Sequence, residues 1–138
     1  MYADKQAMID RYGNDELIQL TDRAMAGVID DTVLDRALED ADGEINGYLS
    51  SRFSAPINPV PTTLVRIACD MARYYLYDDN ATDQVTKRYN DAVKFLKGVA
   101  DGSISIGVSA AGEKPESESL PEFESGGNTF NRKDTSFI

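Results

Sequence analysis

The chain has 138 residues, enough for one domain with a modest hydrophobic core. Its formal net charge is -10, so tight binding of nucleic acid or of an anionic membrane by the whole surface is not expected. There is no histidine and only one cysteine, Cys69, which excludes a histidine general base, a Cys–His nucleophile pair and an internal disulfide.

Two further absences limit the class of protein. No run of about 18 apolar residues could span a bilayer, and no charged-then-apolar leader precedes a small-residue cleavage site. We therefore expect a soluble protein, made in a cytoplasm, without a membrane partner. With so little catalytic chemistry available, we also expect a binding protein without a cofactor rather than an enzyme.

Two short helices are predicted at the start of the chain. Asp4 is a suitable N-cap for a helix over residues 5–12, and Gly13 is a natural C-terminal stop. A second helix is expected from about residue 14 to residue 20. It has too few apolar residues to fold alone, so it must pack on another element.

The clearest amphipathic pattern begins after Asp30 or Asp31, either of which could be the N-cap, and runs to about residue 49 or 51. Its apolar residues recur at helical spacing and form one stripe: Leu34, Ala37, Leu38, Ala41, Ile45, Tyr48 and Leu49.

A proline-rich link at residues 54–61 then predicts a stiff, extended connection. The next segment, residues 62–77, is apolar around most of its circumference, which is typical of the central helix of a bundle. Asp83 is the expected N-cap of a last helix that reaches about Ala100. The alternation in residues 103–108 has the period of a short strand, which would need a partner strand.

Residues 109–138 have a different composition, rich in Gly, Ser, Glu and Pro, that cannot bury enough apolar surface to offset the entropy of ordering. We therefore predict a helical domain over residues 1–108 and a flexible C-terminal arm over residues 109–138. The fold class is mainly α: a small bundle of about four to five helices with a short C-terminal strand and a flexible tail. The last residues regain aromatic and basic side chains, which indicates either a docking motif or simply a frayed end.

The clusters of charged residues indicate structural roles rather than a metal site or a catalytic site. Asp40, Asp42 and Glu44 superficially resemble a calcium loop, but alternate residues of a helix diverge, and the glycine and the bidentate glutamate are not at the required positions. Asp70 has basic neighbours at i−4 and i+3, Arg66 and Arg73, which predicts an ion-pair network within one helix.

The remaining candidates are contact residues. Cys69 is expected to be a small buried hydrophobe, and the tyrosines of residues 74–77 suit a core edge or a protein interface. The unpaired strand and the arm supply the candidate partner-binding residues Ile104, Ile106, Val108, Phe123, Phe130, Arg132, Lys133 and Phe137.

Several blocks in order along the first 108 residues carry a resemblance to a known family. They are MYAD at 1–4, IDRYG at 9–13, DADGEINGYL at 40–49, RF at 52–53 before the prolines, VRIACDMARYYLY at 65–77, RYNDAVKFL at 88–96 and GSISIG at 102–107. In these blocks the chain resembles a family of Mu-like phage and prophage virion proteins. The helical layout of that family is similar to that of the adaptor, or head-completion, proteins of siphophages.

The resemblance implies a structural virion protein, a head–tail connector subunit. Such subunits form a ring, usually of twelve copies, beneath the portal and extend the DNA channel toward the tail. The implied partners are the portal protein, a tail-proximal neck or tail protein and further copies of the chain, while DNA passes through without specific binding. The implied location is the virion, after synthesis in the cytoplasm of the bacterial host.

Two alternatives from other classes remain. One is a small regulatory protein-binding module, antitoxin-like or anti-repressor-like, with a disordered acidic arm. The other is an enzyme that uses carboxylates alone, for which no residue pattern was found. Size distinguishes the first from a connector, because a fixed complex with one folded partner favours the regulatory module and a ring favours the connector.

Overall fold

Five α-helices and one short 3-10 helix make up the described part of the computed structural model, which covers residues 1–54, 57 and 59–106. They are α1 (Lys5–Tyr12), α2 (Asn14–Thr21), α3 (Asp31–Leu49), α4 (Thr62–Tyr77), η1 (Asp78–Asn80) and α5 (Asp83–Asp101). The prediction of a mainly α bundle with four to five helices is confirmed. The predicted arm, residues 109–138, lies outside the described residues.

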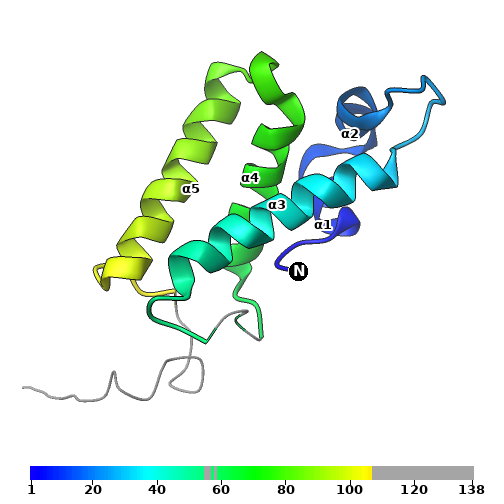
Figure 1. Cartoon of the computed structure of the whole chain (residues 1–138). Helices are drawn as coiled ribbons and strands as arrows, with labels where there is room; N and C mark the ends of the chain where they lie inside the picture. Colours follow the sequence, from blue (N-terminus) through cyan, green and yellow to red (C-terminus); the bar gives the residue numbers. More distant parts are fainter. Residues whose placement is uncertain (55–56, 58, 107–138) are drawn as a thin grey trace, which may run out of the picture. The chain divides into compact units, whose positions relative to one another are not determined.

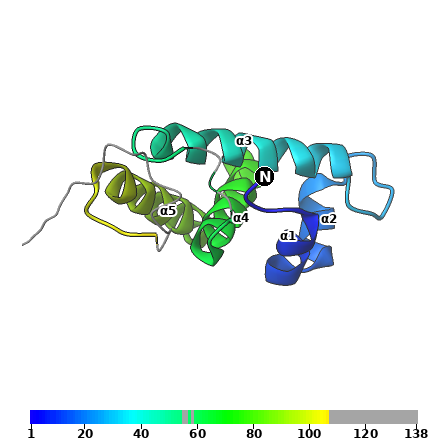
Figure 2. The ribbon, with the colours of Figure 1, turned by 90° about the horizontal axis from the view of Figure 1, so that it is seen from below.

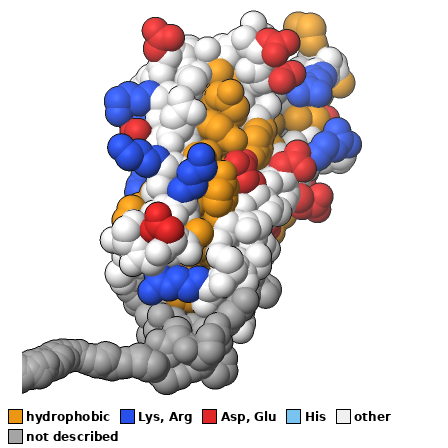
Figure 3. Space-filling model, turned by 60° about the vertical axis from the view of Figure 1, so that its left-hand side comes forward, with side chains coloured by type: hydrophobic (Ala, Val, Ile, Leu, Met, Phe, Trp, Pro, Cys, Tyr) orange, Lys and Arg blue, Asp and Glu red, His pale blue; other side chains and the backbone are white. Residues whose placement is uncertain are grey.

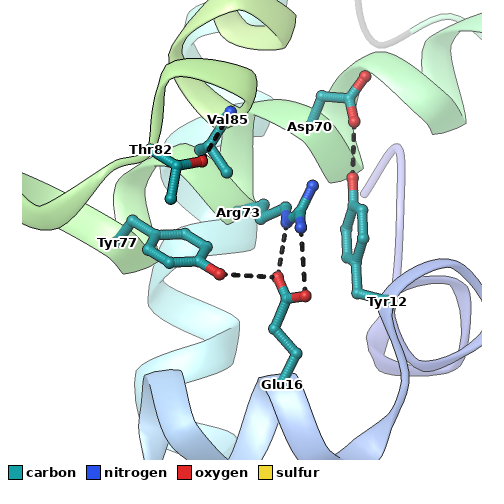
Figure 4. A network of polar contacts seen from close by, with 7 residues as sticks. All are labelled: Tyr12, Glu16, Asp70, Arg73, Tyr77, Thr82 and Val85. Carbon is teal, nitrogen blue, oxygen red and sulfur yellow. Dashed lines mark hydrogen bonds and ion pairs between the residues drawn. The ribbon is translucent and has the colours of Figure 1, made fainter.

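Side-chain caps explain where three of these helices begin. The Asp4 carboxylate accepts a hydrogen bond from the amide of Ala7 at 2.8 Å. The Asp30 carboxylate accepts from the amides of residues 32 and 33, which identifies Asp30 rather than Asp31 as the cap of α3. The prediction that Asp83 caps α5 is wrong, because the hydroxyl of Thr82 accepts the bond from Val85 at 3.2 Å (Figure 4) and Asp83 is the first helical residue.

The helix α4 lies at the centre of the bundle. Figure 1 shows α3 crossing in front of α4, with α5 on one side and the short pair α1 and α2 on the other. The turned view in Figure 2 shows α3 as a layer of its own above the other helices. Since α4 contacts all four of the other α-helices, the predicted central position of residues 62–77 is confirmed.

The hydrophobic core follows from that position. Eight of the sixteen residues of α4 are buried, and one of them is the charged Asp70. The stripe of α3 points inward as predicted, with Leu34, Leu38 and Ile45 at most 1% exposed. The core is completed from outside the helices by Tyr2, Phe53 and Ile57.

The predicted strand at residues 103–108 is not present in its described part, residues 103–106. Gly102 ends α5 with a left-handed backbone at φ 91°, and the chain then turns back onto the helix. The amide of Ile104 donates to the carbonyl of Gly98 at 3.1 Å, which is a capping bond and not a sheet bond. Ile104 packs against the core and Ile106 is buried, so the apolar alternation reflects the packing of a capping turn. Gly107 and Val108 lie outside the described residues.

The loop between α2 and α3 is closed at its base by side chains. The Asp22 carboxylate accepts hydrogen bonds from the amides of residues 26 and 27, at 2.8 and 2.7 Å. The hydroxyl of the buried Thr21 accepts from the amide of Asp30 at 2.9 Å. The end of α2 and the start of α3 are therefore held together although the loop itself projects from the bundle (Figure 1).

None of the helices within the described residues is both long enough and apolar enough to cross a lipid bilayer.

The packing of α3 on α4 predicts a contrast between two adjacent residues. Leu38→Ala removes a side chain that is 1% exposed and should lower the free energy of unfolding by about 2–5 kcal/mol, because a cavity replaces buried methyl groups. Glu39→Ala, on the exposed side of the same turn, should change it by less than about 0.5 kcal/mol. Urea unfolding followed by circular dichroism measures both, and equal losses would contradict this packing.

Candidate functional site

The first polar cluster joins α4 to the N-terminal helices and is drawn in Figure 4. Arg73 of α4 donates two hydrogen bonds to Glu16 of α2, from Nε at 2.6 Å and from Nη2 at 3.1 Å. The hydroxyl of Tyr77 donates to the same carboxylate at 3.3 Å. The guanidinium also lies 4.4 Å from the ring centroid of Tyr12, in a cation–π contact. This bidentate, partly buried pair fixes the position of α2 on α4.

The buried carboxylate of Asp70 belongs to the same region. Only 5% of the residue is exposed, and it accepts a hydrogen bond from the Tyr12 hydroxyl at 2.6 Å. Arg66 lies 3.7 Å away on the solvent side, as its spacing predicted. Burial, followed by the bond to Asp70, raises the pKa of Tyr12, which therefore stays protonated as a donor.

The predicted network of Arg66, Asp70 and Arg73 is thus correct for its first pair only. Arg73 points to Glu16 of α2 instead of completing a pair within its own helix. Helical spacing could not reveal this partner, because Glu16 is 57 residues away in the sequence.

The second polar cluster joins three helices around Glu44 of α3. This carboxylate accepts hydrogen bonds from the hydroxyls of Tyr75 of α4 and of Tyr89 of α5, the latter at 3.0 and 3.1 Å. The ring of Tyr74 stacks on that of Tyr89, with centroids 4.1 Å apart. Burial and the bond to Glu44 raise the pKa of Tyr89 to about 12 and raise that of Tyr75 as well. Both tyrosines are therefore donors throughout the physiological pH range.

A third set of bonds holds the first residues of the chain. Tyr2 is 3% exposed; its hydroxyl donates to Asn46 of α3 and accepts from the amide of Ile57 in the proline-rich link. The amide of Tyr2 donates to Asp42 at 2.8 Å. One tyrosine therefore holds α3 and the proline-rich link together.

These bonds also account for the acidic residues that resemble a calcium loop. Asp42 is bonded to Tyr2, Glu44 is bonded to two tyrosines, and Asp40 is exposed on the outer side of α3. Within the described residues, no three Cys, Asp or Glu side chains lie close enough together to hold a metal ion. In this arrangement, carboxylates of one helix accept hydrogen bonds from phenol and guanidinium groups of other helices.

The surface has both exposed apolar side chains and hollows that a partner could contact. Figure 3 shows a band of apolar side chains between charged groups, on the side of the molecule that carries α5. In the projecting α2–α3 loop, Met25 is 89% exposed and Val28 is 60% exposed. Surface hollows are present too, and the one lined by residues 1–4, Ala7 and Val65 has a volume of about 330 Å³.

The sequence-predicted contact residues lie in two places. Ile106 is buried in the chain's own core and Ile104 is half-buried against it, so neither side chain is free to form the core of an interface in this state. The other candidates lie outside the described residues: Val108, Phe123, Phe130, Arg132, Lys133 and Phe137.

Cys69 is fully buried on α4, as expected for a small hydrophobe. Desolvation is the largest influence on its thiol and raises its pKa to about 11.

Comparisons with known proteins indicate a phage origin. The family model described as "Bacteriophage Mu, Gp36" matches residues 2–125. The chain is 39% identical over 132 residues to the "Mu-like prophage FluMu protein gp36" of Haemophilus influenzae, which covers 96% of this chain and 94% of the relative. It is also 39% identical over 139 residues to "Gene product J" of Escherichia phage Mu, with 99% of each chain covered.

The Arg73–Glu16 pair predicts a large mutational effect. Arg73→Met should lower the free energy of unfolding by about 1–3 kcal/mol, because it leaves Glu16, which is 23% exposed, without its bidentate donor. Adding Glu16→Gln should cost less than the sum of the two single changes. Lys87→Met removes an exposed ion pair with Asp91 and should leave the urea midpoint almost unchanged. Equal effects of Arg73→Met and Lys87→Met would refute a structural role for the α2–α4 pair.

Burial of Cys69 predicts slow alkylation of the folded protein. At pH 8, a pKa of about 11 in place of 9.0 lowers the thiolate fraction about 100-fold, and steric burial slows the reaction further. Because the folded pKa is the higher one, this thiol favours the folded state below pH 9, and that contribution is lost as the pH rises toward 11. Iodoacetamide labelling followed by mass spectrometry, with and without urea, measures the rate; rapid labelling of the folded chain would contradict its burial.

Proposed function

This chain belongs to the bacteriophage Mu Gp36 family, and we propose that it is a head–tail connector (adaptor) subunit of the virion. In this role it docks beneath the portal, on the path from the head to the tail, and extends the DNA channel. It works by binding other proteins and carries out no reaction.

One observation carries the proposal: two Mu-like phage and prophage proteins match the chain over almost its full length. The whole described region is therefore shared with proteins of phages of this kind. The helical layout supports the finer assignment, because short N-terminal helices, a long amphipathic helix, a central apolar helix and a last amphipathic helix form the pattern that resembles the adaptor proteins.

The tyrosine–carboxylate clusters support a structural role. They join α3, α4 and α5 at Glu44 and join α2 to α4 at Glu16. Satisfied polar networks between helices rigidify a core and specify one packing, which suits a structural subunit.

The charge of the chain is compatible with DNA passage. A net charge of -10 makes the average surface repel a phosphate backbone, so DNA could slide past a ring of such subunits. A reconstruction of the assembled ring with a basic lumen would contradict this part of the proposal.

Loss of the protein should block virion completion after DNA packaging. In the phage that encodes this chain, a null mutation is expected to give heads that leak DNA or cannot join tails, seen by negative-stain electron microscopy of the lysate. Supplying the chain in trans should restore tailed particles. Normal infectious virions without the protein would refute the connector assignment, and a stable complex with one non-virion protein would favour a regulatory module.

A further inference from the structure

Two outer helix faces carry opposite charge. On α3 the exposed side chains of the first ten residues include four acids and one base, namely Asp31, Asp35, Glu39, Asp40 and Arg36. On α5 the exposed side chains of residues 84–97 include four bases and one acid, namely Lys87, Arg88, Lys94, Lys97 and Asp91. A local excess of base is unexpected in a chain of net charge -10, and it matches the local excess of acid on α3.

Among the exposed acidic residues of α3, only one forms an ion pair with another described residue of the chain. Asp31 pairs with Lys5 at 2.8 Å, whereas Asp35, Glu39 and Asp40 form no ion pair with another described residue. On α5 the pair of Lys87 with Asp91 is exposed, at 75% and 60% of the side chains. Both surfaces are therefore able to form ion pairs with another molecule.

The residues on the second half of the α3 outer face are small as well as exposed. Gly43 and Gly47 follow Glu39 at intervals of four residues, so the three lie on one line of the helix. A Cβ built on either glycine meets nothing within 4 Å. Each glycine costs about 0.5–1 kcal/mol relative to alanine inside a helix, and packing inside this chain does not require either of them. Gly98 of α5 differs, because a Cβ there would collide with Ile104.

We propose that the outer face of α3 is the docking surface for the outer face of α5 from a second copy of this chain. The acids of α3 pair with Lys87, Arg88, Lys94 and Lys97 of the neighbour, and the glycines let the neighbouring helix approach closely. This inference rests on the proposed function and names the contact between adjacent subunits.

The geometry of the bundle suits such a contact. α3 and α5 lie in different layers, so their outer faces point in different directions (Figure 2). A contact between two different surfaces is heterologous, and repetition of a heterologous contact builds a ring when the rotation closes. A face that paired with its own copy would stop at a dimer.

Charge exchange between the two faces tests the contact. The first variant, Glu39→Lys with Asp40→Lys, makes the α3 face basic; the second, Lys94→Glu with Lys97→Glu, makes the α5 face acidic. Each variant, supplied alone to the null phage, places like charges opposite each other and should lower the yield of infectious particles about 100-fold or more. Supplied together, the two variants attract each other at both faces and should restore the yield to within about threefold of wild type by alternating around the ring.

Controls separate this contact from folding and from the connector role. Every variant should unfold at the wild-type urea midpoint, because all four residues are exposed. Asp10→Lys with Asp79→Lys makes the same change in net charge as the α3 variant, on other exposed residues, and should support a normal yield. A null phage that wild-type chain rescues establishes that the protein is needed, so the proposed function and the contact can fail separately.

The remaining outcomes overturn the contact. If single-face variants rescue as well as wild type, α3 and α5 do not meet. If only the α5 variant fails and co-expression does not restore the yield, the basic face binds DNA or another virion protein. Replacing Gly43 and Gly47 with leucine gives an independent measurement: a normal yield from this folded variant would exclude close approach at the glycines.

Discussion

The packing of α4 against all four of the other α-helices determines what the rest of the chain must do. α4 faces solvent at Arg66, but two other charged residues, Asp70 and Arg73, lie against the neighbouring helices with side chains only 5% and 13% exposed. An unpaired charge in such a place costs several kcal/mol, so each must find a partner on a neighbouring helix. Tyr12 and Glu16 supply those partners, and the short helices α1 and α2 are thereby fixed in position.

The same constraint explains why tyrosine is used so often between helices. A phenol buries its ring as an apolar body and donates from its rim, so it can reach a carboxylate across a packed interface. Four tyrosines donate to a carboxylate of another helix, namely Tyr12, Tyr75, Tyr77 and Tyr89. Tyr2 donates in the same way to the side-chain amide oxygen of Asn46 on α3. Because burial raises the pKa of Tyr12, Tyr75 and Tyr89, these bonds do not change with pH near neutrality. The fold therefore has specific polar contacts without a titrating histidine.

Local patterns predicted the helices well, because helices depend on nearest neighbours and on caps. The 3.6-residue stripe of α3 and the apolar circumference of α4 were visible in the sequence, and the cap of α3 was narrowed to two neighbouring residues, Asp30 and Asp31. The alternation at residues 103–106 led to the wrong prediction of a strand. Two isoleucines that pack a capping turn are spaced two residues apart, as are the residues on one face of a strand. Glu16 and Glu44 could not be found at all, because nothing local distinguishes a carboxylate that binds a residue tens of positions away from one that faces water.

The loop between α2 and α3 is suited to carry an inserted tag, because hydrogen bonds hold its base closed. The bond from the Asp30 amide to Thr21, and those from residues 26 and 27 to Asp22, close the loop before the helices diverge. Its tip at Met25 is exposed and makes no structural bond through its side chain to a described residue. A small fluorescent or gold-binding tag inserted at Met25 would leave both helix ends in place, since tolerated insertions concentrate at exposed loop tips. Such a tag would mark where each subunit sits inside an intact particle, and its radius from the channel axis would give the orientation of the bundle in the neck.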